Sequence, residues 1–307
     1  MQVRILAVAA LVLVAAGVFH SQPQAQEPTP ARLSVNVVQV PLLLTVSDSK
    51  GQLITDLKKE NFRVFEDGRA QKIDFFSHEL NRPLSIALLV DTSSSAYSQL
   101  EFERQAAKEF FTKIVKPRKD RASVIGFNAD PTLLADFTDD IEKLSAGLNK
   151  LDAGGGTAVY DAVYKAAEKK LAPEAGDRRK VIILISEGYD TASSYSLAEA
   201  TEMAQKHDIV IYAISINKIT DSKGEEKSEG DKAIRNLVNE TGGKAYYPIK
   251  LTELGEQFQK IEEELRSQYL LTYTPTSPSN GAYRKLRVDL TDRKYTAHTR
   301  AGYYATK

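Results

Sequence analysis

The sequence predicts an α/β fold, in which a doubly wound, mostly parallel sheet of the Rossmann-like kind is joined by a small β-sandwich-like module. Two continuous apolar runs, residues 84–90 and 181–185, lack helical periodicity and are typical of strands buried on both faces. Segments with apolar residues at helical spacing lie between such runs, which favours a parallel sheet covered by helices. The ends of the chain instead show apolar residues at every second position, as in half-buried antiparallel strands.

The N-terminal segment, residues 1–26, predicts a secretory signal peptide. Arg4 precedes an apolar run over residues 5–19, and small residues follow that run. The run is too short to span a bilayer comfortably, so a retained membrane anchor is the weaker alternative. We expect no membrane span once this signal is removed.

Composition restricts the location and the class of partner. The 307 residues include no cysteine, and cysteine-free export is ordinary for proteins of the bacterial envelope. The sequence therefore predicts a secreted or periplasmic protein. Lys plus Arg and Asp plus Glu both number 41, so no basic excess indicates a nucleic-acid partner.

Three segments are expected after the signal: an N-terminal β segment over residues 27–79, an α/β domain over residues 80–267 and a C-terminal β segment over residues 268–307. Neither β segment has enough strands to bury its apolar face alone, because an isolated hairpin is marginal in water. We therefore expect the two β segments to pack together.

Local signals define the elements within these segments. Asp67-Gly68 predicts a tight hairpin turn between residues 62–65 and 73–76, and Pro41 indicates an edge strand. Residues 217–230 are polar and charged and predict a solvated loop. Helices and further strands are predicted, in chain order, near residues 107–114, 123–127, 141–148, 159–166, 197–206, 209–216 and 254–265.

Oxygen-bearing side chains follow the first buried strand. Asp91, Ser93 and Ser95 come directly after it, and ligands of open α/β sheets lie beyond the carboxyl ends of the strands. Such oxygens suit a hard cation such as Mg²⁺. The alternative is that one of these side chains only caps the following helix.

Two later stretches offer matching groups. Thr157 follows three consecutive glycines at a predicted helix start, and Glu187-Gly188 follows the strand over residues 181–185. A second hydroxyl and a second carboxylate are thereby expected at the same edge of the sheet.

The order Asp-x-Ser-x-Ser, Gly-Gly-Thr, then a strand ending in an acidic residue and glycine resembles the von Willebrand factor type A domain with its metal-ion-dependent adhesion site. The resemblance covers about residues 84–250. It implies that Asp91, Ser93, Ser95 and Thr157 are metal ligands, directly or through water.

The fifth ligand position departs from the family pattern. Glu187 stands where the family usually has Asp, and it is one methylene longer. Because Mg²⁺ demands near-ideal octahedral geometry, Glu187 is expected to bind it directly, to bind through a changed water arrangement, or to shift preference toward another ion such as Mn²⁺ or Ca²⁺. Asp190 is a candidate for compensating the change.

Residues 62–68 and 301–304 also resemble flanking parts of a bacterial secreted family related to this domain, for which no common ligand is established. The resemblance implies an adhesion or scaffolding protein whose bound cation contacts an acidic residue of a partner protein. A scaffold with a vestigial metal site is the first alternative.

An enzyme is the weaker expectation, and no catalytic residues are assigned. A metal-assisted hydrolase also begins with an acid at a strand end, but phosphatases of the haloacid dehalogenase type need a second Asp where Ser93 stands. The sequence has no Gly-x-Ser-x-Gly elbow, no phosphate-binding Gly-Lys-Ser/Thr loop and no cysteine.

Overall fold

The computed structural model describes residues 39–79, 82–217, 229–277 and 279–305. The predicted signal peptide and most of the predicted loop over residues 217–230 lie outside these residues. Among the described residues, no helix is both long and apolar enough to cross a membrane.

A six-stranded sheet forms the centre of the α/β part. Its strands, in spatial order, are β10 (Ala245–Tyr246), β9 (Ile209–Ser215), β8 (Arg179–Ser186), β5 (Leu84–Asp91), β6 (Arg121–Phe127) and β7 (Pro131–Thr138). All neighbouring pairs are parallel except β6 with β7. Every residue of β5 is buried, because β5 has β8 and β6 on its two sides and a helical layer over each face. The predicted fold class is confirmed.

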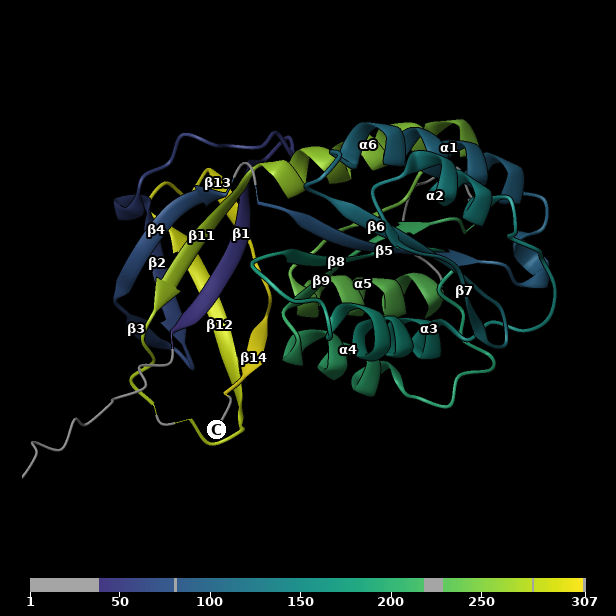
Figure 1. Ribbon diagram of the computed structural model, residues 1–307. Coiled ribbons are helices and arrows are strands. Elements are labelled where there is room, and N and C mark those ends of the chain that lie inside the picture. The colour runs from purple at the N-terminus through teal and green to yellow at the C-terminus, as the bar shows by residue number, and fades with distance from the viewer. Residues whose placement is uncertain (1–38, 80–81, 218–228, 278, 306–307) are drawn as a thin grey trace, which may run out of the picture. The chain divides into compact units, whose positions relative to one another are not determined.

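Helices cover both faces of this sheet (Figure 1). One face packs against α1 (Leu100–Ile114), α2 (Ile141–Leu148) and α6 (Leu254–Arg266). The other face packs against α3 (Val159–Lys165), α4 (Leu197–Lys206) and α5 (Glu229–Thr241), and α3 continues into a π-helical turn over Ala166–Leu171. Alternate residues of each central strand enter one core or the other, as a pleated strand requires.

Two antiparallel sheets contain the strands from both ends of the chain. One has the order β13 (Tyr295–His298), β1 (Val40–Asp48), β11 (Gln268–Tyr273), β4 (Ile73–Glu79). The other has the order β14 (Gly302–Tyr304), β12 (Tyr283–Leu290), β2 (Phe62–Glu66), β3 (Arg69–Gln71). Their apolar side chains form one shared core. The predicted β-sandwich-like module is therefore present, and its strands come from both predicted β segments.

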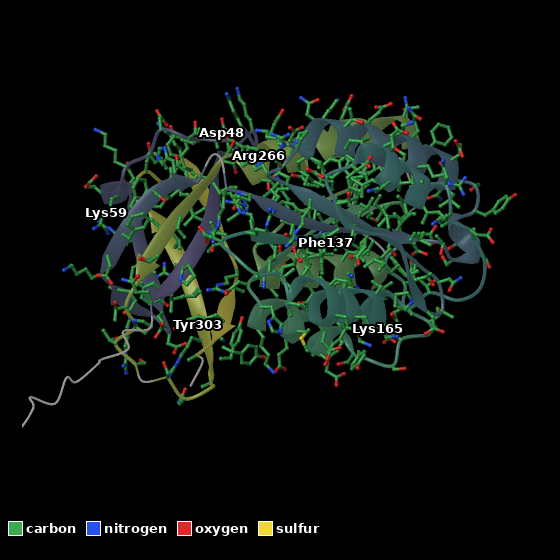
Figure 2. All side chains as sticks on the ribbon, in the orientation of Figure 1. Asp48, Lys59, Phe137, Lys165, Arg266 and Tyr303 are labelled. Carbon is green, nitrogen blue, oxygen red and sulfur yellow. The ribbon has the colours of Figure 1, made fainter. Side chains whose placement is uncertain are left out.

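A buried carboxylate joins the two sheets of this module. Glu66 of β2 accepts hydrogen bonds from the hydroxyls of Tyr273 in β11, at 2.5 Å, and of Tyr303 in β14, at 2.8 Å. Tyr303 is labelled in Figure 2. A buried carboxylate needs such donors, because leaving it unpaired is costly. The network therefore ties two strands of the C-terminal segment to a strand of the N-terminal segment.

Two local predictions need correction. Asp67 and Gly68 form the predicted turn with φ of 48° and 80°, but the returning strand is β3. Residues 73–76 belong to β4, which pairs in the other sheet. Pro41 does not mark an edge strand, since β1 lies between β11 and β13. It is tolerated because β13 pairs only with the half of β1 over residues 45–48.

Two long elements, β7 and α5, were absent from the sequence predictions. The half-exposed strand β7 has no regular alternation of buried residues, so period-two reasoning does not reveal it. Helix α5 did carry a signal, since Ile234, Leu237, Val238 and Thr241 are buried at helical spacing. The charged residues before α5 masked that pattern.

The separate folding of the predicted segments is testable by truncation. Deleting residues 268–307 removes both neighbours of β1 and the β12 partner of β2. We expect limited proteolysis to cleave residues 39–79 rapidly in this variant, whereas residues 84–266 should resist cleavage. An N-terminal segment that stays protected would contradict the pairing.

Candidate metal centre

The candidate site begins where the two central strands end side by side. The parallel register of β5 and β8 pairs Val90 with Ile185, so the next residues, Asp91 and Ser186, are neighbours. The Ser186 hydroxyl donates a 2.6 Å hydrogen bond to Oδ2 of Asp91, and both side chains are buried. Ser186, to which the sequence analysis assigned no role, therefore orients the Asp91 carboxylate.

The chain after Asp91 folds back over that carboxylate. The backbone N–H of Ser93 donates to Oδ1 of Asp91 at 2.9 Å, and the Ser93 and Ser95 hydroxyls lie 3.1 Å apart. Ser93 is buried, whereas Ser95 is exposed. The first turn of α1 receives no side-chain cap from this loop, since its N-cap is Gln99, which makes no such bond. The structure therefore does not support the helix-cap alternative.

The glycine loop lies directly on this segment. The Gly155 carbonyl accepts hydrogen bonds from the backbone N–H of Ser94, at 3.3 Å, and from its hydroxyl, at 3.2 Å. The N–H of Gly154 donates to the carbonyl of Thr92 at 2.8 Å. Gly155 has a φ of 81°, a conformation that glycine adopts without strain. These bonds fix the loop that leads into Thr157.

Thr157 is held from its other side by the loop after β8. Its N–H donates to the Thr191 hydroxyl at 3.0 Å, and its carbonyl accepts from the N–H groups of Thr191, at 2.8 Å, and Ala192, at 3.1 Å. The Thr157 residue is 9% exposed. Its backbone position is thus determined by two loops from different strands.

Asp190 serves the start of α3. Its carboxylate accepts from the N–H of Tyr160 at 3.1 Å and from the N–H and hydroxyl of Ser193, at 3.1 and 2.5 Å. Within α3, the ammonium group of Lys165, which is labelled in Figure 2, forms an ion pair with the carboxylate of Asp161 at 3.0 Å. The carboxylate of Asp190 is thus engaged at the helix start, so the structure gives no support to its compensating for Glu187.

The backbone of Glu187 is fixed by close packing against the start of α5. Gly188 has a φ of 78°, and a Cβ added there would lie 2.4 Å from the carbonyl oxygen of Gly230. The N–H of Gly188 donates to the Ser186 hydroxyl at 2.9 Å, and the amide of Asn217 donates to the Glu187 carbonyl at 2.9 Å. Glu187 therefore follows a rigid strand end, with its side chain partly buried.

The structure adds one acidic residue that the sequence analysis missed. Glu103 of α1 is 0% exposed. Burial raises its pKa well above the usual range, and the nearby charges of Asp91 and Glu187 raise that pKa further. A signal for it existed, because Glu103 lies four residues before Ala107 on the apolar face of the helix.

These groups suit a hard cation. The Asp91 carboxylate accepts from the N–H of Ser93, whose hydroxyl lies 3.1 Å from that of Ser95. The glycine loop before Thr157 is hydrogen-bonded to this segment. Glu187 directly follows Ser186, whose hydroxyl donates to Asp91. Across the described ranges, no three His, Cys, Asp or Glu side chains form a group that could hold a metal ion. Hydroxyl oxygens are therefore needed, and such oxygen ligands are typical of Mg²⁺ and Ca²⁺. Coordination by these five residues stays a prediction.

Replacing Ser186 tests the hydrogen bond on which this geometry depends. Ser186→Ala leaves Oδ2 of Asp91 and the N–H of Gly188 without this hydroxyl. We expect the free energy of unfolding, measured by urea denaturation, to fall by about 1–3 kcal/mol. The exposed Ser194→Ala is the control and should change it by less than about 0.5 kcal/mol. Equal stability of both variants would contradict the proposed support of Asp91.

Comparison with known proteins gives the same fold. The family model for the von Willebrand factor type A domain matches residues 85–264. A von Willebrand factor type A protein from Catenulispora acidiphila is 12% identical, with a TM-score of 0.50 over 80% of this chain and 74% of that one. Proximal thread matrix protein 1 of the mussel byssus, described with a zinc-occupied MIDAS motif, is 16% identical, with a TM-score of 0.52 over 65% of this chain and 49% of that one. A search of curated proteins found no match. At these identities the structures show similarity of fold alone.

Proposed function

Because this chain belongs to the von Willebrand factor type A domain family, we propose that it is an exported adhesion or scaffolding protein that binds a partner protein through a divalent cation. The observation that carries the proposal is the convergence of a buried carboxylate and adjacent hydroxyls at the carboxyl end of β5. This edge of an open α/β sheet is where ligands usually bind.

The residues proposed to hold the cation are Asp91, Ser93, Ser95, Thr157 and Glu187, directly or through water. Their oxygens favour Mg²⁺, with Mn²⁺ or Ca²⁺ as alternatives. When bound with an incomplete protein shell, such a cation offers a position for a carboxylate from another molecule. The exposed Ser95 lies on the open side of the proposed site, whereas Asp91 and Ser93 form its buried side.

The zinc-occupied motif in the mussel protein supports the idea that a domain of this fold carries a metal. For this chain, the longer Glu187 argues for a changed water arrangement or ion preference, because Mg²⁺ tolerates little deviation from octahedral geometry. If no cation binds, the vestigial-site scaffold replaces this proposal.

We further propose a secreted or periplasmic location and a non-enzymatic role. The predicted signal peptide and the absence of cysteine from the sequence support the location. The Ser93 hydroxyl lies against Ser95, and Asp91 is held by Ser186, an arrangement that suits binding better than acid-base chemistry. A partner that offers an acidic residue fits the hard cation proposed here.

Asp91 provides the direct test of cation binding. We expect Asp91→Asn, which preserves shape but removes the charge, to lower Mg²⁺ affinity at least about a hundredfold in calorimetry. The reason is that losing even a residue that only supports a metal ligand costs about 10–100-fold. The control is Asp130→Asn, whose side chain is 87% exposed. Mg²⁺ affinity that Asp91→Asn leaves unchanged would sink the metal-site assignment.

Glu187 tests how the fifth position is used. We expect Glu187→Asp to tighten Mg²⁺ binding or to change the preference among Mg²⁺, Mn²⁺ and Ca²⁺, because it restores the shorter carboxylate. Glu187→Gln keeps the length of the side chain and removes its charge. Comparison of the two variants therefore separates the effect of length from the effect of charge. Calorimetric affinities for all three ions that stay at the wild-type values in both variants would place residue 187 outside the site.

A further inference from the structure

Glu103 occupies a position where the helix pattern calls for an apolar side chain. The buried face of α1 includes Leu100, Ala107, Phe110 and Phe111, and Glu103 lies on the same face. It is 0% exposed, a degree of burial that charged side chains reach rarely unless they are paired. Packing alone would favour an apolar side chain at this position, so it does not explain the carboxylate of Glu103.

Three buried acceptor oxygens at the start of α1 have no hydrogen-bond donor among the residues that the structure describes. Neither carboxylate oxygen of Glu103 has a hydrogen-bond partner in the described part of the chain. The side-chain oxygen of Gln99, which is also buried, has none there either. Gln99 and Glu103 are four residues apart and so share one side of the helix. Three buried acceptors on one side of a helix call for a donor, since buried polar groups in proteins are normally satisfied.

The charges near Glu103 are mainly negative. Its pKa is raised by burial and then by Asp91 and Glu187, which are residues of the proposed cation site. The charge of Arg104 acts in the opposite direction. The guanidinium of Arg104, however, donates to the carboxylate of Glu101 at 3.1 Å and to the carbonyl of Leu151. The Nε–H of Arg104 has no hydrogen-bond partner among the described residues, and no bond joins it to Glu103.

We propose that Glu103 is a supporting acidic residue of the cation site, in which its carboxylate oxygens accept hydrogen bonds from water bound to the cation and its negative charge strengthens cation binding. This role rests on the proposed function. It accounts for the acidic residue at an apolar position, for the unsatisfied oxygens and for the proximity of two other carboxylates. Mg²⁺ usually retains several water ligands, and each supplies O–H donors of the kind that these acceptors lack.

The competing explanation is that Glu103 is a neutral acid held in the core without relation to a cation. A protonated carboxyl group still has one O–H donor and needs an acceptor for it. The two explanations differ in what replacement does to cation affinity. A core residue contributes to stability whether or not the cation is present, whereas a supporting residue of the site contributes to cation binding.

The experiment compares Glu103→Gln with Glu101→Gln in the full mature chain. Glu101 lies two residues away on the same helix with its side chain 82% exposed, so it is a matched control. Calorimetry measures Mg²⁺ and Mn²⁺ affinity, and thermal unfolding is followed with each ion and with EDTA. For Glu103→Gln we expect affinity to fall about 10–100-fold, the usual loss for residues that support metal ligands. The rise in Tm on adding the ion should shrink, while the Tm in EDTA stays equal or rises.

Each outcome decides one question. Affinity within twofold of wild type in Glu103→Gln would overturn the role of Glu103 while leaving the proposed function intact. Failure of the unchanged protein to bind Mg²⁺, Mn²⁺ or Ca²⁺ would overturn the proposed function and the Glu103 role with it. If Glu103→Gln does not fold, Glu103→Met, which suits an apolar position, allows the same comparison, and wild-type affinity in that variant would equally overturn the role.

Discussion

The hydrogen bond between Ser186 and Asp91 joins the ends of the two central strands, and the candidate site depends on it. Parallel pairing of β5 and β8 places the two residues next to each other, and burial makes the bond strong and its loss costly. The same serine accepts from the N–H of Gly188. One hydroxyl therefore positions both the first acid of the site and the backbone beside Glu187.

Three loops, those that follow β5, α2 and β8, then converge on this point through hydrogen bonds of their backbones. The Asp91–Ser95 segment binds the glycine loop, and the glycine loop leads into Thr157, which the segment after β8 holds. These contacts use N–H and carbonyl groups that surface loops would otherwise leave to water. The hydroxyl and carboxylate groups are consequently carried by a frame that does not depend on a cation for its position.

Three acidic residues, Asp91, Glu103 and Glu187, belong to the region of the candidate site. The pKa of Glu103 is raised first by its burial and then by the charges of Asp91 and Glu187. Gathering like charges in a buried region is unfavourable unless a cation or protons compensate them. This cost is a physical reason to associate the region with binding rather than with stability. The Glu66 network in the β module shows the contrasting case, a buried acid that tyrosine hydroxyls satisfy.

Much of the architecture follows from local sequence patterns, because apolar runs and helical spacing report burial directly. The apolar run predicted the strand over residues 84–90. The Asp-x-Ser-x-Ser motif after it and the Asp67-Gly68 turn were likewise predicted from neighbouring residues alone. Other features depend on residues distant in the chain. The pairing of residues 73–76 with β11, the use of Asp190 at α3 and the support of Asp91 by Ser186 arise from contacts across at least 30 residues. Glu103 illustrates the reason: its position on the helix was predictable, but only tertiary packing decided that the helix would carry its carboxylate into a buried region near Asp91.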